Sequence, residues 1–234
     1  MRRLLLLLYA CCFLCPHLRA QRETVKNQPY ADMRLLHLGF HLGLHTQDMI
    51  LNHTGLSSPS GETWFAEIPA YSPGFSVGII GDMFMNPYLN LRLIPSIHFG
   101  DKTFVFREHT SGEKYTASVR SNYITLPLEL KYSSLRLNNY RPYLTGGLYG
   151  ALDLGRKKGE ALLLKGIDYG LSVGLGCDIY FSFFKLCPEL KFFFGFRDLI
   201  EKNRIDLTQP DLGVYTNAFS RGSSRMIVLT FNFE

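Results

Sequence analysis

Residues 35–46, LLHLGFHLGLHT, alternate between apolar side chains and polar or small ones. One set is Leu36, Leu38, Phe40, Leu42 and Leu44, and the other is His37, Gly39, His41, Gly43 and His45. A strand separates these sets because successive side chains point to opposite faces. A helix would scatter the leucines and hold two glycines in its interior, each costing about 1 kcal/mol. The segment is therefore predicted to be a β-strand.

The same alternation recurs along the chain and predicts eight strands. They are residues 35–48, 74–84, 88–99, 121–132, 142–153, 169–181, 186–196 and 226–234. In the clearest of them one face is wholly apolar, while the other mixes glycine with histidine, aspartate, arginine and asparagine. A soluble barrel would turn its apolar face inward. Hydrocarbon outside and an enclosed polar interior explain the pattern better. The predicted fold is all-β, an eight-stranded antiparallel transmembrane β-barrel of the outer-membrane type.

The connections between the predicted strands alternate in length. The shorter ones are residues 85–87, 133–141 and 182–185, and the longer ones are 49–72, 100–120, 154–166 and 197–224. With the N-terminus in the periplasm, every short turn falls there and every long loop falls outside. Aromatic residues gather at the predicted periplasmic ends, as an interfacial girdle does. They are Phe84, Tyr88, Tyr132, Tyr140, Tyr143, Tyr180, Phe181, Phe183, Phe184, Phe231 and Phe233.

Two prolines, Pro95 and Pro127, fall inside predicted strands. Each removes one backbone donor from the hydrogen-bond ladder, and a closed barrel has no free edge where that loss is harmless. We therefore expect a bulge or a local kink at both positions.

The chain begins with MRRLLLLLYACCFLCPHLRA, in which two arginines near the start precede an apolar run and Ala20 ends the stretch. This is the pattern of a secretory signal peptide, residues 1–20, with cleavage after Ala20. Residues 21–234 then form the barrel domain. Cleavage as a lipoprotein before Cys11 is the alternative, although few apolar residues would precede it.

Cleavage would leave 22 basic and 20 acidic residues, because Arg2, Arg3 and Arg19 are lost from the 25 lysines and arginines. A nearly neutral chain gives no electrostatic support for binding nucleic acid, and we expect no such partner. The remaining cysteines are Cys177 and Cys187. Counted along their strands they point to opposite faces, so we expect two free thiols.

The three histidines His37, His41 and His45 are each separated by about 13 Å of extended strand. Ligand bonds to a metal such as zinc are about 2 Å, so no two of these side chains can share one ion. We expect no metal site and no cofactor.

Inward-facing charges in a narrow barrel must be paired or hydrated, so we expect a structural network in the lumen. Its predicted polar members are His37, His41, His45, Asp82, Arg92, Glu129, Lys131, Asp178, Glu189 and Lys191. Gly-x-Ser-x-Gly occurs at residues 74–78 and 170–174, but both copies lie inside predicted strands and not at the strand-to-helix turn that exposes such a nucleophile. We expect no enzymatic activity. The alternative is a lipid-A-modifying barrel enzyme that uses histidine with serine or glutamate.

Three stretches together resemble the PorT family, the outer-membrane barrel proteins of the type IX (Por) secretion system. They are residues 35–49, 121–147 and 176–200, and the second is the most specific. The matching positions are His37, Gly39, Gly43, Thr46, Asp48, Pro127, Lys131, Asn139, Tyr140, Arg141, Pro142, Tyr143, Phe184, Lys185, Leu186, Pro188, Glu189, Leu190 and Lys191. The sequence departs from the family at His41 and His45, where small polar residues are expected, and at Cys187, where serine is expected.

The resemblance implies a protein of the bacterial outer membrane that takes part in the export of cargo proteins and is not an enzyme. Its partners would be other proteins of the secretion machinery, in or at the outer membrane, together with membrane lipids. A barrel of eight strands is filled by its own side chains. We therefore expect the protein to assist or scaffold export without being the conduit. A passive surface or adhesin barrel is a further alternative.

The turn at residues 133–142, SSLRLNNYRP, is the longest of the predicted periplasmic turns and lies within the most specific match. We take Arg136, Asn139 and Arg141 as candidate contacts to a partner protein. The alternative is that Asn139 and Arg141 only cap the ends of their strands.

Overall fold

The computed structural model describes residues 26–53, 64–70, 73–108, 114–155, 163–201 and 219–234, so the predicted signal peptide lies outside the described residues. The strands are β1 (Leu36–His53), β2 (Trp64–Ala70), β3 (Pro73–Asn86), β4 (Leu89–Leu93), β5 (Ser96–Phe99), β6 (Asp101–Glu108), β7 (Lys114–Arg120), β8 (Tyr123–Ser133), β9 (Tyr140–Asp153), β10 (Ile167–Tyr180), β11 (Lys185–Gly195) and β12 (Phe219–Phe233). A short 3-10 helix, Ala31–Met33, precedes β1. No helix among the described residues is long and apolar enough to cross a membrane.

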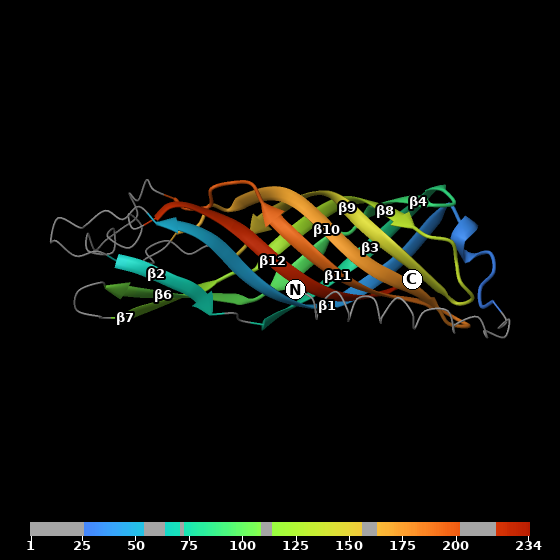
Figure 1. The fold of residues 1–234 in the computed structure, drawn as a ribbon, viewed down its shortest axis with the longest axis horizontal. Helices are drawn as coiled ribbons and strands as arrows, with labels where there is room; N and C mark the ends of the chain where they lie inside the picture. Colours follow the sequence, from blue (N-terminus) through green and yellow to red (C-terminus); the bar gives the residue numbers. More distant parts are fainter. Residues whose placement is uncertain (1–25, 54–63, 71–72, 109–113, 156–162, 202–218) are drawn as a thin grey trace, which may run out of the picture.

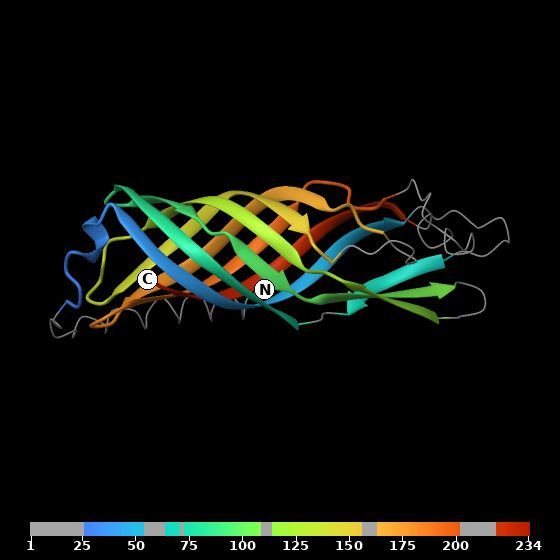
Figure 2. The ribbon, with the colours of Figure 1, turned by 180° about the vertical axis from the view of Figure 1, so that it is seen from behind.

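Nine of the strands form one antiparallel sheet that closes on itself. β1 pairs with β12, and the sheet continues through β11, β10, β9 and β8 to β4, β5 and β3, which pairs with β1 again. β4 and β5 both lie between β3 and β8, so they are two halves of one span. The sheet therefore crosses eight times, which confirms the predicted eight-stranded antiparallel barrel (Figures 1 and 2).

The break between β4 and β5 lies at Pro95, where an irregularity was predicted. The backbone carbonyl of Pro95 still accepts the Ile79 N–H at 3.0 Å, and the Ile94 N–H reaches the carbonyl of Pro127 at 3.2 Å. The register is the same on both sides of the break. The bulge predicted at Pro127 is absent, because β8 runs through this residue and pairs with β9 without a shift. The side of Pro127 that lacks an N–H faces Ile94, in the break between β4 and β5. The donors that Pro95 and Pro127 lack are therefore both missing at this single break.

The two faces of the sheet divide as the alternation predicted. The apolar side chains point outward: Leu38 is 69% exposed and Leu148 is 64% exposed. The polar side chains of the same strands point inward, and His41 and His45 are buried on β1. This is the arrangement of a barrel whose outer wall meets hydrocarbon and whose interior is polar.

The predicted aromatic girdle is formed only in part. Phe181 and Phe184 stack at the short-turn end with ring centroids 4.9 Å apart, and Phe40 stacks on Phe233 at 5.0 Å. Tyr143 and Tyr180 do not belong to the girdle, because both are buried inside the barrel. Along each strand every second side chain points inward, and Tyr143 and Tyr180 occupy such inward positions. This alternation, which we call strand parity, decides where they point, and their position near a turn does not.

The long connections contain structure that the alternation did not predict. β2, β6 and β7 form a separate three-stranded antiparallel sheet with the order β2-β6-β7. These strands lie within residues that the sequence assigned to the loops 49–72 and 100–120. Figure 1 shows this sheet beyond the left end of the barrel, opposite the end that carries the 3-10 helix. β1 and β12 also continue beyond their predicted limits, to His53 and from Phe219.

Candidate functional site

The barrel interior is organised around Arg92, a fully buried side chain on β4. Its guanidinium lies 3.1 Å from Asp82, 3.2 Å from Glu189 and 2.8 Å from Glu234. These carboxylates come from β3, from β11 and from the residue that follows β12. One cation thus joins strands from different parts of the ring.

Three lysines extend the same network. Lys131 on β8 lies 2.8 Å from both carboxylate oxygens of Asp178 on β10. Lys191 on β11 lies 2.8 Å from Glu129 and 3.4 Å from Glu189. The third, Lys185, pairs with Glu234. Glu189 further accepts hydrogen bonds from the side chains of Tyr143, Thr145 and Asn232.

The network holds four cations and five carboxylates among the described residues, namely Arg92, Lys131, Lys185 and Lys191 with Asp82, Glu129, Asp178, Glu189 and Glu234. Removing such groups from water costs several kcal/mol for each ion unless a partner compensates it. Each of these charges has an opposite charge in contact. The geometry is that of a structural network that fixes how the strands sit around the lumen.

Sequence reasoning omitted two members of this network, Lys185 and Glu234. Lys185 had been assigned to the turn 182–185, and Glu234 is the last residue of the sequence. Both share the inward parity of their neighbours, since Cys187 and Asn232 are buried. That parity is the signal that could have found them.

Of the three histidines of β1, His41 lies beside the charged network, since it lines a cavity of about 10 Å³ together with Lys191. His37 contacts the carbonyl of Ala31 at 2.5 Å, while His41 and His45 are buried in the lumen. His45 packs edge-on against His98 of β5 with ring centroids 5.1 Å apart. No group of three or more potential ligand side chains in the described part of the chain could hold a metal ion.

Two small cavities lie in the described part of the interior. One cavity near the middle has a volume of about 10 Å³, and another near the end that carries the long loops has about 30 Å³. A single water molecule needs about 10–15 Å³ on this measure, so these spaces hold water-sized groups. The lumen is a packed interior with small cavities.

Comparison with known protein families gives a match over residues 20–201 to the family described as "Outer membrane protein beta-barrel domain". The chain belongs to this family. It is therefore a protein of the bacterial outer membrane, and its apolar outer wall contacts lipid. No curated protein sequence matches it.

Several solved structures are similar to this outer-membrane barrel protein at low sequence identity. Neisserial surface protein A is 13% identical, with 84% of this chain and 97% of that chain covered and a TM-score of 0.43. OprG from Pseudomonas aeruginosa is 11% identical, with 83% and 93% covered and a TM-score of 0.41. AlkL is 10% identical, with 92% and 94% covered and a TM-score of 0.42. Scores this low carry no argument about function.

At the short-turn end of the barrel, the N-terminal segment Asn27–Met33 folds back against the turn between β8 and β9. Arg136 of this turn donates to the backbone carbonyls of Asn27 and Gln28 and lies 3.6 Å from the centre of the Tyr180 ring. The side-chain oxygen of Asn139 accepts the Asn27 N–H at 2.9 Å. We call the segment Asn27–Met33 the N-terminal strap.

Asp32 is the anchor of the strap. It lies 3.1 Å from Arg141 and accepts a hydrogen bond from the Tyr180 hydroxyl. Arg141 also donates to the carbonyls of Ser134 and Pro87. The three candidate contact residues of this turn, Arg136, Asn139 and Arg141, are thus brought together, and their polar groups bind within the protein.

The two cysteines lie where their strand parity placed them. Cys187 is buried inside the barrel, and Cys177, one strand away, lies on the opposite face of the sheet and is half-buried. Both are free thiols, as predicted.

Proposed function

We propose that this outer-membrane barrel is a non-enzymatic accessory of a type IX (Por) secretion system, which assists or scaffolds protein export without forming the conduit. The resemblance of residues 35–49, 121–147 and 176–200 to the PorT family supports the assignment to this system. In this proposal the mature protein begins at Gln21, and residues 21–234 form the barrel domain.

The filled lumen supports the part of the proposal that separates this protein from the conduit. Arg92 and its three carboxylates lie across the interior, and the two cavities found among the described residues are of water size. A folded cargo protein has no room beside them. Any contribution to export must come from the wall, the loops or the periplasmic turns.

The turn between β8 and β9 is the surface we propose for a partner protein of the machinery. Because Arg136, Asn139 and Arg141 are engaged within the protein, the contact would use the side chains that this turn leaves exposed. Leu135 is 69% exposed and Leu137 is 66% exposed, and both lie beyond the ends of the strands. An exposed apolar pair beside polar groups is a common feature of protein interfaces.

Deletion of the gene tests the export role. Cargo proteins should accumulate unprocessed in the periplasm, whereas normal cargo on the cell surface would contradict the proposal. Complementation with the double variant Leu135→Ser/Leu137→Ser tests the contact surface. Export should fall although the barrel still migrates faster on gels before boiling. The matched control is Leu154→Ser, an equally exposed leucine at the opposite end, which should restore export.

A surface or adhesin barrel is the second candidate, and the sheet β2-β6-β7 favours it. This sheet extends beyond the outer end of the barrel, where it would meet the surroundings of the cell (Figure 2). Replacing residues 103–118 by a short turn should then reduce adhesion and leave export unchanged. The opposite result would favour the export role.

The third candidate is a lipid-A-modifying enzyme. Burial of His41 and His45 in the lumen argues against it, because lipid A would meet the outer wall. The test is lipid mass spectrometry after His41→Ala or His45→Ala. An unchanged lipid A profile is the expected result.

A further inference from the structure

Two arginine side chains, Arg197 and Arg221, lie at the rim of the barrel that carries the long loops. Arg197 follows the end of β11, and Arg221 lies near the start of β12, the neighbouring strand of the sheet. Arg197 donates to the backbone carbonyl of Ile167 at 3.2 Å, and Arg221 donates to that of Phe196 at 2.8 Å. Both guanidinium groups are therefore held in one part of the rim, formed by β10, β11 and β12.

The carbonyls that hold these arginines belong to residues of the apolar outer wall. Ile167 is 54% exposed and Phe196 is 52% exposed. Tyr169 and Phe194 are exposed beside them on β10 and β11. Aromatic residues on the outside of a barrel gather where hydrocarbon gives way to the polar interface. The two guanidinium groups thus lie at the edge of the lipid-facing surface.

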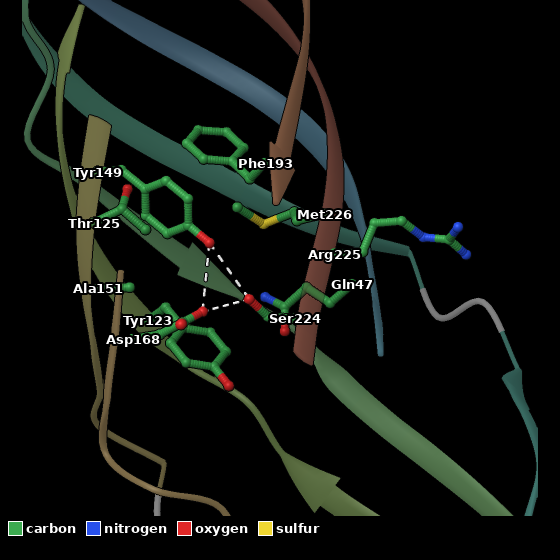
Figure 3. A pocket seen from close by; sticks show the side chains of 10 residues that line it. All are labelled: Gln47, Tyr123, Thr125, Tyr149, Ala151, Asp168, Phe193, Ser224, Arg225 and Met226. Carbon is green, nitrogen blue, oxygen red and sulfur yellow. Dashed lines mark hydrogen bonds between the residues drawn. The ribbon is translucent and has the colours of Figure 1, made fainter. Parts of the chain in front are cut away.

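The outward direction of Arg221 follows from strand parity on β12. In Figure 3 the side chains of Ser224 and Met226 point towards the small cavity inside the barrel, and that of Arg225 points away from it. Arg221 lies four residues before Arg225 without a shift of register, so it shares the outward face. Ser224 donates to the carboxylate of Asp168, which is buried on the inner side of the sheet. The sheet therefore separates this carboxylate from the outward arginine.

Both guanidinium groups keep donors available to a ligand. A guanidinium has five N–H donors, and the hydrogen bond to a carbonyl uses one of them. Arg221 is exposed and Arg197 is half-buried, and neither forms an ion pair within the part of the chain that the structure describes. Arg225 differs, because it is paired with Asp48. We therefore do not count Arg225 as part of the site.

The carboxylate of Asp198, next to Arg197 in the chain, is engaged by the backbone. One of its oxygens accepts the N–H of Ile200 at 3.3 Å and that of Gly222 at 2.9 Å. Lys165 brings a further positive charge to this region, since its ammonium group donates to the backbone carbonyl of Asp198 at 3.1 Å. The rim therefore presents cationic N–H donors at the edge of an apolar surface.

We propose that Arg197 and Arg221 bind the phosphorylated headgroup of a lipid in the outer leaflet of the membrane. The planar guanidinium group matches phosphate oxygens and can bind two of them through parallel N–H···O bonds. The exposed side chains of Ile167, Phe194 and Phe196 contact the acyl chains of the same lipid. With the orientation expected from the loop lengths, this end of the barrel faces the cell exterior. The site does not depend on a role in export.

Native mass spectrometry of the folded protein in detergent micelles tests the site. The probe is lipid A that carries two phosphate groups, and its control is the same lipid A after enzymatic removal of both phosphates. The phosphorylated form should bind saturably and about 10- to 30-fold more tightly, since each basic residue near an anionic headgroup contributes about fivefold. This comparison needs only the unaltered protein.

The double variant Arg197→Gln/Arg221→Gln should lose the preference for the phosphorylated form, and each single variant should lose about fivefold in affinity. Glutamine removes the charge but keeps an N–H donor for the carbonyl that holds each side chain. The control is Arg34→Gln, an exposed arginine at the opposite end of the barrel, which should leave the affinity unchanged. The faster migration of unboiled samples on gels confirms that the variants fold.

Equal binding of the two forms of lipid A by the unaltered protein would mean that the apolar wall alone holds the lipid, and would overturn the proposal. An unchanged affinity in the folded double variant would also overturn it. Inorganic phosphate is the competitor that separates a lipid from a free ion, and it should not displace lipid A at equal concentration. Displacement would assign the arginines to free phosphate and overturn the assignment to a lipid headgroup.

Discussion

The guanidinium of Arg92 lies 2.8 Å from the carboxylate of Glu234, although 142 residues separate them in the sequence. The same guanidinium contacts Asp82 and Glu189. Closure of the barrel is what brings these groups together, because β4 and β12 are not neighbours in the sheet. Arg92 therefore links carboxylates that only the closed barrel brings into contact.

Replacement of Arg92 by alanine should lower the free energy of unfolding by about 3–5 kcal/mol, because it leaves three buried carboxylates without that cation. Urea unfolding in lipid vesicles measures the change. Arg34→Ala removes an exposed arginine just before β1 and should have little effect. Equal unfolding midpoints for the two variants would contradict this prediction. They would show that water in the interior stabilises the three carboxylates without Arg92.

The pair Lys131–Asp178 should behave as a coupled unit. Asp178→Leu alone leaves the lysine buried without its partner, at a cost of about 3–5 kcal/mol. The double variant Lys131→Met/Asp178→Leu should recover most of that loss, since an apolar pair of similar volume needs no counter-charge. A double-mutant cycle from urea unfolding gives the coupling energy. Costs that simply add would show that the two side chains act independently.

Gly147 and Gly146 offer a matched test of packing in adjacent residues of β9. A Cβ at Gly147 would lie 2.6 Å from the Glu129 Cα and still nearer the Leu128 carbonyl, whereas one at Gly146 meets nothing within 4 Å. Gly147→Ala should cost about 1–3 kcal/mol, and Gly146→Ala should change stability by about 0.5 kcal/mol or less. Unfolding midpoints compare them directly, and a Gly147→Ala protein as stable as Gly146→Ala would refute the close approach.

Asp32 should hold the N-terminal strap without contributing to the barrel itself. Asp32→Ala removes the pairing with Arg141 and the bond from Tyr180, so trypsin should cut after Lys26 and Arg34 more rapidly. The urea midpoint of the barrel should stay nearly constant. Asp101→Ala, at the opposite end, is the control and should leave the cleavage rate unchanged. Unchanged cleavage in Asp32→Ala would mean that Arg136 and Asn139 suffice to hold the strap.

The positions of the membrane-crossing strands were predictable, because lipid on one face and a polar lumen on the other make apolar and polar side chains alternate with a period of two. Leu36, Leu38, Leu42 and Leu44 of β1 all follow it and point outward. Strand parity also placed Cys177 and Cys187 correctly. The position of a residue near a turn was a weaker guide, as Tyr143 and Tyr180 show, because their side chains follow the parity of the strand into the lumen.

The features that sequence reasoning missed depend on contacts between distant segments. The sheet β2-β6-β7 crosses no hydrocarbon, so its strands carry no comparable contrast between two environments. The engagement of Arg136 and Asn139 by the strap follows from how the chain before β1 folds back, which no local pattern encodes. Asp168 was missed because the predicted strand began one residue later, at Tyr169.

The charged interior has a consequence for how the protein reaches its membrane. Asp178 on β10 is paired with Lys131 on β8, two strands away. Glu189 on β11 is paired with Arg92 on β4, across the ring. An open, half-assembled sheet would present these bare ions to acyl chains, which cannot solvate them. We therefore expect insertion into the membrane to be coupled to closure of the ring.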